Sequence, residues 1–391
     1  MKTSFSLAPR EAVTQLRLSK IREVANAGLG RTDVLQFWFG EPDEVTPSFI
    51  RDAASASLAA GETFYSHNLG LPELRATLAN YLSGLHGRTF ASDTIAVVSS
   101  GVNALMLAAQ AIISPGDKVV CVTPLWPNLV EIPKILSANV QCVPLGFEAA
   151  GWKLDLQALL DALTPDVRLV MINSPNNPTG WTLTRDDQIA ILAHCRKLGI
   201  WILCDDAYER LVFDPHVKSA PSFLSLATPQ DRIVSANTFS KSWLMTGWRL
   251  GWLVAPPPLI EALGKLIEYN TSCAPVFIQR AGIVAVREGE AVIARTRERY
   301  GAARDRLCAG LNKISGVHAP PAPGAMYAFF KIEGLRDSLT LCKRLVAEAD
   351  LGLAPGAAFG DEGEGFVRWC FASELPRLDD GLARFAAFMR K

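Results

Sequence analysis

Lys241 stands alone in a stretch that otherwise suits a protein interior. Residues 235 to 252 read SANTFSKSWLMTGWRLGW, so small hydroxyl residues and tryptophans surround one lysine, and Arg249 follows eight positions later. A partly desolvated lysine has a lowered pKa, which favours the neutral, nucleophilic amine. The alternative is a surface lysine whose aliphatic stem packs along apolar neighbours. The first interpretation predicts covalent chemistry on a carbonyl group, with Arg249 as a permanently charged ligand for an anion.

Two carboxylates and a phenol follow another apolar segment. The run GIWILC leads directly into Asp205 and Asp206, and Tyr208 lies two positions further on. A carboxylate at the end of so apolar a run is costly unless it has a charged or protonated partner. The alternative is an aspartate that caps a helix, and with two in a row we expect one of them to be a cap.

Three further loops carry residues that suit ligand binding. Ser100 and Gly101 open a helical stretch whose free backbone N–H groups favour an anion. Trp126, between two prolines in PLWPN, offers an aromatic face to a planar ligand, and Asn177 in PNNPTG presents an amide from a turn. Each has a structural alternative as well, namely a capped helix, core packing or a tight turn.

The segments between these loops predict a mainly parallel, doubly wound α/β sheet. Short runs rich in Val and Ile alternate with helical patterns from about residue 93 to 255, and the runs are apolar throughout, as in strands covered on both faces. The predicted strands are TIAVVSS, KVVCVTP, NVQCVPL, RLVMINSP, GIWILCDD, RIVSANTFS and RLGWLVAP. Ligands bind beyond the carboxyl ends of such strands, so we expect the loops to meet at one edge of the sheet.

Together these side chains suit a planar, phosphorylated ring that contains nitrogen and carries an aldehyde. The lysine would form a Schiff base with the aldehyde, and the carboxylate would keep a ring nitrogen protonated so that the ring accepts electrons. This pairing of lysine and aspartate is typical of pyridoxal phosphate. The helix N-terminus, Thr238 and Arg249 would bind the phosphate.

Three motifs occur in a fixed order: NNPTG, then D-x-x-Y, then a hydroxyl residue three positions before Lys241 with an arginine in TGWRLG eight residues after it. On these motifs the chain resembles the class I/II aminotransferases, pyridoxal-phosphate enzymes of fold type I, and the resemblance covers essentially the whole chain. It implies that fold, a homodimer, and a ping-pong reaction that moves an amino group between an L-amino acid and a 2-oxo acid.

The resemblance also implies a role for each matched residue around the cofactor ring. Lys241 would be the Schiff-base lysine and the proton carrier between the substrate Cα and the cofactor. Asp205 would pair with the ring nitrogen, because its spacing to Tyr208 selects it over Asp206. Tyr208 and Asn177 would hydrogen-bond the ring oxygen.

Further matches concern the ring face, the phosphate and the substrate. Trp126 would stack on the ring. Several residues would hold the phosphate: Ser100, Gly101, Val102, Thr238 and Arg249, with Ser240 as a weaker candidate. Tyr65, in TFYSHNLGLPELR, matches a tyrosine that reaches the phosphate of the partner subunit. The substrate α-carboxylate site would comprise Gly40 in FGEPDE, Asn177, and Arg368 in GFVRWCFA.

Physical reasoning also supports a carboxylate partner for Arg368. It lies between apolar residues in a strand-like run, where a guanidinium is costly without a carboxylate. The substrate can supply that carboxylate. The alternative is a structural salt bridge, for which Glu364 and Glu374 are the candidates.

The matched residues do not decide which amino acid is the amino donor, and they do not exclude one other activity. A carbon–sulfur β-lyase would share the lysine, the aspartate and the arginine. Aspartate-specific members of the best-known subgroup take a second arginine from the segment that here reads YNTSCAPVF, which has no Arg or Lys. Trp38, Phe39 and Tyr327 would favour an apolar or aromatic donor, although they are equally consistent with core packing.

The flanks of the predicted sheet differ from it in pattern. Residues 1–35 resemble an amphipathic helical arm, and residues 286–391 mix a long charged helix over residues 287–307 with strands such as AMYAFFKI and GFVRWCFA. We expect a smaller α+β domain formed by both termini: an arm and part of the small domain at 1–44, the large cofactor-binding domain at 45–285, and the rest of the small domain at 286–391.

Composition narrows the class of protein. Lys plus Arg and Asp plus Glu both number 39, which argues against nucleic acid or an anionic membrane as the main partner. There is neither the apolar core of a signal peptide at the N-terminus nor an apolar run of about 18 residues. The eight cysteines are scattered and the five histidines lack metal-ligand spacing. We therefore expect a cytoplasmic enzyme without a metal.

Overall fold

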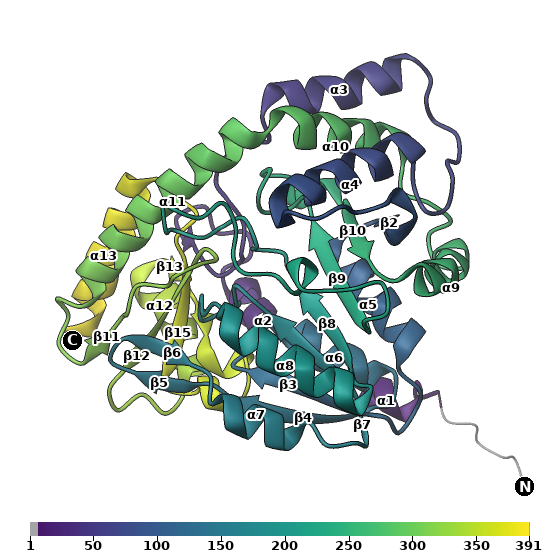
Figure 1. Cartoon of the computed structure of the whole chain (residues 1–391). Coiled ribbons are helices and arrows are strands. Elements are labelled where there is room, and N and C mark those ends of the chain that lie inside the picture. Colours follow the sequence, from purple (N-terminus) through teal and green to yellow (C-terminus); the bar gives the residue numbers. More distant parts are fainter. Residues whose placement is uncertain (1–6, 391) are drawn as a thin grey trace, which may run out of the picture.

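A seven-stranded sheet lies at the centre of the computed structural model, which describes residues 7–390 (Figure 1). The strand order is β2-β10-β9-β8-β7-β3-β4, and all neighbours are parallel except that β10 is antiparallel to both of its own. The strands are β2 (Ile95–Val98), β3 (Lys118–Thr123), β4 (Asn139–Pro144), β7 (Val167–Asn173), β8 (Trp201–Asp205), β9 (Ile233–Thr238) and β10 (Gly251–Val254). The predicted mainly parallel sheet and each of its predicted strands are confirmed.

Helices cover the sheet on both faces because its strands are apolar on both. On β3, Val119 and Cys121 belong to one apolar core, and Val120 and Val122 to another. The first core includes α5 (Gly101–Ile112), α6 (Pro127–Ile135) and α9 (Pro257–Glu268); the second includes α7 (Leu156–Ala162) and α8 (Arg185–Leu198). A third core packs α3 (Ser48–Ala59), α4 (Pro72–His86) and α10 (Val276–Glu288) against β2 and β10.

The C-terminal part forms a second sheet, seen in green and yellow beside the first (Figure 1). Its strands are β11 (Val317–His318), β12 (Tyr327–Ile332), β15 (Phe366–Cys370) and β14 (Ala354–Pro355), and its helices are α11 (Glu290–Leu311), α12 (Ser338–Ala349) and α13 (Leu375–Met389). Two short hairpin strands, β5 (Gly146–Glu148) and β6 (Gly151–Lys153), pair with each other. The long charged helix was predicted to start at residue 287, but α10 ends at Glu288 and α11 starts at Glu290. Gly289 between them has no room for a Cβ, which would meet the Ala285 carbonyl oxygen at 2.2 Å.

The N-terminal arm contains α1 (Glu11–Thr14), α2 (Lys20–Ala27) and β1 (Leu35–Gln36), and its first six residues lie outside the described range. α1 lies against α6, where the Arg10 side chain also donates to the Ile135 carbonyl oxygen, whereas α2 and β1 pack on the second sheet. β1 pairs in parallel with β13 (Leu351–Gly352), and Val24 and Phe37 share one apolar core with Leu345 and Trp369. The shared core supports the proposal of one small domain made from both termini, with boundaries at 44/45 and 285/286.

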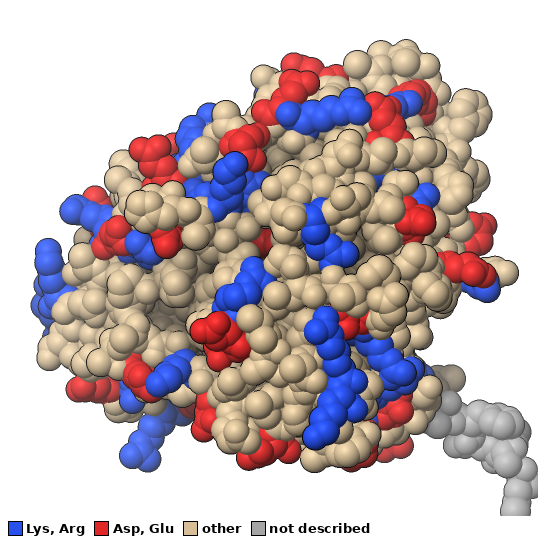
Figure 2. Space-filling model, in the orientation of Figure 1, with Lys and Arg blue, Asp and Glu red and all other residues tan. Residues whose placement is uncertain are grey.

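Charges of both signs are mixed over the face of the molecule shown in Figure 2. Within residues 7–390, no helix combines the length and the apolar character needed to cross a membrane. The same residues contain no group of three or more His, Cys, Asp or Glu side chains arranged to hold a metal ion.

Candidate active site

The loops that follow β2, β3, β7, β8 and β9 meet at one edge of the sheet and line a cavity of about 440 Å³. Strand register brings them together, since Asn173 at the end of β7 pairs with Asp205 of β8, and Asp205 pairs with Ala236 of β9. All predicted site residues except Ser100 and Tyr65 line this cavity: Gly40, Gly101, Val102, Trp126, Asn177, Asp205, Tyr208, Thr238, Ser240, Lys241, Arg249 and Arg368.

Lys241 lies in the turn after β9, with its amine in the cavity. Its Nζ donates a hydrogen bond to the Gly40 carbonyl oxygen at 2.6 Å and lies 5.8 Å from the centre of the Tyr208 ring. Burial, helped by the nearby Arg368 and Arg249, lowers the pKa of Lys241 to about 8, although Cys370 and Glu41 act in the opposite direction. The alternative of a surface lysine is therefore wrong, and a much larger fraction of the amine is neutral near neutral pH than in an ordinary lysine.

The lowered pKa predicts that Lys241 weakens the cofactor-free fold below about pH 8. The unfolded chain keeps its proton up to about pH 10.4, so between these values the unfolded state binds more protons and the free energy of unfolding rises with pH. We expect Lys241→Met to be more stable than the wild type by about 3 kcal/mol below pH 8, and this difference to disappear above about pH 10.5. Urea unfolding of the cofactor-free protein across pH measures it. Lys197→Met, on the exposed side of α8, is the control, and an equal pH dependence there would contradict the prediction.

Asp205 and Asp206 point to different surroundings although they are neighbours in sequence. Asp205 lines the cavity, and burial raises its pKa to about 7, with Asp206 adding to the rise while the Ala207 N–H and Lys241 oppose it. Asp206 instead accepts a hydrogen bond from the Ser235 hydroxyl, which also accepts one from the Asn237 amide. Neither side chain caps a helix, so the expectation that one would be a cap is wrong, whereas the choice of Asp205 over Asp206 agrees with this geometry.

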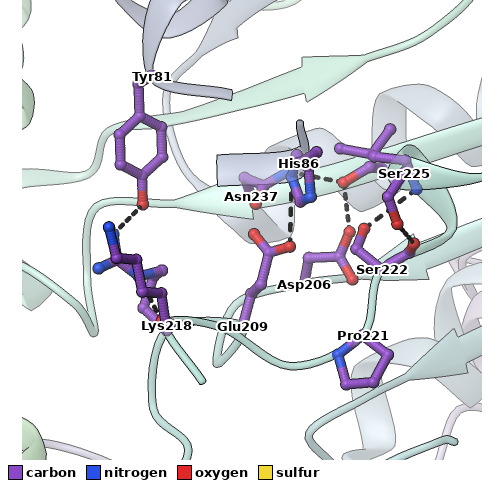
Figure 3. A network of polar contacts seen from close by, with 12 residues as sticks. Tyr81, His86, Asp206, Glu209, Lys218, Pro221, Ser222, Ser225 and Asn237 are labelled. Atoms are coloured by element: carbon purple, nitrogen blue, oxygen red, sulfur yellow. Dashed lines mark hydrogen bonds and ion pairs between the residues drawn. The ribbon is translucent and has the colours of Figure 1, made fainter. Parts of the chain in front are cut away.

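A buried polar network lies behind Asp206 and outside the cavity lining (Figure 3). Glu209 lies 3.4 Å from the Nε2 of His86, which is the last residue of α4. Burial raises the pKa of Glu209 well above its usual range, with Asp206 adding to the rise, and burial lowers the pKa of His86 to about 4. No sequence motif signalled this network, because its members come from separate loops and helices.

The start of α5 offers backbone donors to an anion. Ser100 caps the helix, and its side-chain oxygen accepts from the Asn103 N–H at 3.0 Å, so the alternative of an ordinary cap holds for this side chain. The N–H groups of Gly101 and Val102 come first in the helix, where no carbonyl of the helix can accept from them. A Cβ on Gly101 would meet Thr238 at 3.1 Å, which keeps these amides close to the end of β9. The result is a cradle of positive potential on the cavity wall.

Thr238, Ser240 and Arg249 lie on the wall beside this helix start. The Thr238 hydroxyl donates to the Ser240 hydroxyl at 2.8 Å, and both residues are buried. Arg249 is exposed and donates to the Thr246 carbonyl oxygen at 2.5 Å. Among the described residues no carboxylate is within ion-pair distance of Arg249, so its charge is free for an anion.

Tyr208 is held in place by Tyr327, which sequence analysis had left open between a position in the pocket and one in the core. The hydroxyls of Tyr208 and Tyr327 lie 2.7 Å apart, and both side chains are buried. Tyr327 comes from β12 and also limits Gly40, because a Cβ at position 40 would lie 1.9 Å from its hydroxyl oxygen. Gly40 is therefore required where the N-terminal arm approaches the second sheet.

Arg368 reaches the cavity from β15 and is only 2% exposed. Its Nη1 donates to the Asn177 side-chain oxygen at 2.9 Å and its Nη2 donates to the Trp38 carbonyl oxygen. Its guanidinium also lies over the rings of Tyr327 and Phe359, 4.5 and 4.8 Å from their centres.

No carboxylate compensates this buried cation within the described residues. Glu364 accepts from Ser338 and Glu374 is exposed, so the alternative of a structural salt bridge with either is wrong. The Nε of Arg368 is buried without a hydrogen-bond partner. A buried, uncompensated guanidinium at a cavity wall is stabilised by a bound carboxylate, and together with the cradle it fits a ligand set that carries two separate anionic groups.

Tyr65 does not reach the cavity. Its side chain is 88% exposed on the segment between α3 and α4, next to the equally exposed Phe64. Two large exposed aromatic side chains in a row are unusual on a surface that faces only water.

The aromatic residues that sequence analysis considered for the pocket differ in where they lie. Trp126 lines the cavity as expected, whereas Trp38, one of three aromatics considered for the pocket, is buried in the core against Gly28 and Gly352. Phe39 and Tyr327 do line the cavity.

The lining residues that sequence analysis missed are Ser19, Ile21, Arg22, Glu41, Leu105, Asn128, Ala207 and Thr246. Those before residue 45 had no signal, because nothing in the arm's own pattern tells where it packs.

Comparison with known proteins gives a consistent result. Residues 32–384 match the family model "Aminotransferase class I and II". The chain is 31% identical to an aspartate aminotransferase of Pyrococcus horikoshii, over 96% of this chain and 95% of that protein. It is also 31% identical to a probable N-acetyl-LL-diaminopimelate aminotransferase of Bacillus subtilis, over 96% and 94%. The crystal structure of an aromatic aminotransferase from Pyrococcus horikoshii superposes with a TM-score of 0.86 at 30% identity, over 94% of this chain and 98% of that chain.

Proposed function

Because this chain belongs to the class I and II aminotransferases, which depend on pyridoxal phosphate, we propose that it moves an amino group between an L-amino acid and a 2-oxo acid with Lys241 as the reacting amine. The observation that carries the proposal is the cavity in which Lys241, Asp205 and Arg368 meet. When bound, the cofactor supplies an aldehyde that bonds to amines and a ring that accepts electrons.

The residues of the cavity fit this cofactor. We propose that the N–H groups of Gly101 and Val102 bind its phosphate together with Thr238, Ser240 and Arg249, and that Ser100 contributes by fixing the helix start. Trp126 covers one face of the ring. The Asp205 carboxylate would accept a hydrogen bond from the protonated ring nitrogen, and Tyr208 and Asn177 would donate to the ring oxygen.

Two residues act on the substrate. Arg368, with Asn177 beside it and the backbone of Gly40 opposite, binds the α-carboxylate, which fills the unpartnered position at its Nε. Lys241 is placed to take the proton from the substrate Cα, and the same amine would return a proton on the cofactor side. Its lowered pKa suits both directions of transfer near neutral pH.

A donor panel tests the function. The purified protein is expected to absorb in the visible, to lose that band with borohydride, and to form oxo acids from some L-amino acids with 2-oxoglutarate or pyruvate. The relatives named above are aminotransferases and give no support to the carbon–sulfur lyase alternative. Pyruvate release from cystathionine, without amino-group transfer from any donor, would overturn the proposal. The relatives differ in their named substrates, so the panel is also what identifies the donor.

We further propose a homodimer in which Tyr65 completes the phosphate site of the partner subunit. The exposed, adjacent side chains of Phe64 and Tyr65 support a surface that a partner subunit covers. Sedimentation velocity is expected to give a dimer, and Tyr65→Ala is expected to weaken cofactor binding without changing Lys241's own surroundings. A monomer with full activity contradicts this prediction. A cytoplasmic location stays a prediction too.

A further inference from the structure

The cavity holds a fourth cation that the proposed function does not use. Lys241, Arg249 and Arg368 have roles there, but Arg22 of α2 also lines the wall. Its guanidinium lies 4.8 Å from the centre of the Phe39 ring, and Phe39 lines the same wall. The contact with the ring keeps this exposed, flexible side chain beside the cavity.

Arg22 has no anion of its own among residues 7–390. Besides the contact with the ring, its backbone N–H donates to the Ser19 side chain that caps α2. Most arginines nearby in the sequence are engaged, as Arg31 is by Asp33 and Asp350. Glu41 lines the cavity as well, but its carboxylate accepts from the Thr246 hydroxyl at 2.8 Å, and no ion pair joins it to Arg22. The Arg22 charge is thus free for a ligand.

One three-residue segment relates Arg22 to the reacting groups. The Trp38 carbonyl accepts from Arg368, the Phe39 ring carries Arg22, and the Gly40 carbonyl accepts from Lys241. A substrate with its α-carboxylate at Arg368 and its Cα at Lys241 therefore lies along this segment. Arg22 is the cation on the same wall that remains for the other end of that substrate.

We propose that Arg22 binds the distal carboxylate of dicarboxylic substrates, so that acidic amino acids and their 2-oxo acids are preferred. This inference rests on the proposed function, which supplies the α-carboxylate at Arg368. It also supplies a cation for the distal carboxylate that the segment YNTSCAPVF lacks, since that segment has no Arg or Lys and none of its residues line this cavity. A guanidinium matches a carboxylate in shape as well as charge.

Binding of unreactive acids to the cofactor-loaded enzyme tests the inference. Succinate carries two carboxylates and butyrate, of the same chain length, carries one. Calorimetry is expected to show that Arg22→Gln raises the Kd of succinate about 10- to 100-fold and that of butyrate less than about twofold. Phe39→Leu, which removes the aromatic platform, is expected to weaken succinate about two- to fivefold. Arg295→Gln, an exposed arginine on α11, is the control and leaves both values unchanged.

Steady-state kinetics extends the test and separates the two proposals. In Arg22→Gln, kcat/KM for aspartate and glutamate is expected to fall by the same factor as succinate binding, while kcat/KM for alanine stays within about twofold. Equal losses for acidic and neutral donors, or no loss for either, overturn the role of Arg22 and leave the aminotransferase proposal intact. A wild type that uses neutral donors only also overturns the inference alone. A wild type that transfers no amino group from any donor overturns the proposed function.

Discussion

Lys241→Ala is expected to lower the rate of transamination by at least about 10³-fold with every donor, because the variant loses the amine that moves the substrate proton. Positioned acid–base groups alone account for about 10² to 10⁴ in rate, and here the same nitrogen is also the proposed attachment point of the cofactor. The measurement is the single-turnover rate with the best donor of the panel. The folded structure should persist, since the side chain faces the cavity and packs against no apolar core.

The control for this experiment is Lys197→Ala, which removes an exposed lysine from α8. It is expected to keep the wild-type rate. If Lys241→Ala transaminated within about tenfold of the wild type, another group would have to carry the proton, and the assignment of Lys241 would be wrong. The borohydride-sensitive band gives a second readout, because reduction should no longer attach the cofactor to residue 241.

Asp205→Asn should lower kcat by about 10²- to 10³-fold, and Asp206→Asn by no more than a few-fold. The asparagine keeps the size of the side chain but not the negative charge that holds a proton on the ring nitrogen of the cofactor. Removing one preorganised electrostatic partner of this kind typically costs about 3 to 4 kcal/mol in the transition state. The adjacent Asp206 is a close control, since it is equally buried yet bound to Ser235 outside the cavity.

Comparing the two variants also separates catalysis from stability. Replacing Asp206 leaves the Ser235 hydroxyl with an amide instead of a carboxylate, so its effect should appear in unfolding rather than in kcat. Equal losses of kcat in both variants would mean that kcat depends on the total negative charge of the two aspartates and not on the position of Asp205 in the cavity. Urea unfolding of both proteins beside the kinetics distinguishes the two cases.

The sheet and most of its site could be predicted because both follow from local pattern. Runs that are apolar on both faces predict the parallel sheet, and the rule that ligands lie beyond strand ends predicts Asp205, Asn177 and Lys241 on one edge. Family motifs added Arg368 and Gly40, which lie far away in sequence. The structure then decided between alternatives that sequence cannot separate, such as a cavity lysine against a surface lysine.

What could not be predicted depends on how distant segments pack. Arg22 and Phe39 belong to an arm whose position is fixed by contacts with the C-terminal sheet, and their own spacing says nothing about it. Tyr327 sits in a run of aromatic residues where most side chains are core, so its hydroxyl contact with Tyr208 had no sequence signal. The break between α10 and α11 lies at Gly289, where a Cβ would meet both the Ala285 carbonyl oxygen and the Trp243 ring. The contact with Ala285 is local, but the contact with Trp243 depends on the tertiary fold, so the sequence pattern alone did not predict the break.

The segment from Trp38 to Gly40 has a consequence for how such enzymes diversify. Two of its three carbonyl groups, those of Trp38 and Gly40, contact Arg368 and Lys241, so a substitution that shifts this backbone would alter substrate anchoring and amine chemistry together. Arg22 lies on a separate helix and touches the segment only through a side-chain ring. If Arg22 binds the distal carboxylate as proposed, exchanges in α2 can change donor preference while the reaction is preserved, and a laboratory search for new donors should begin its libraries at position 22.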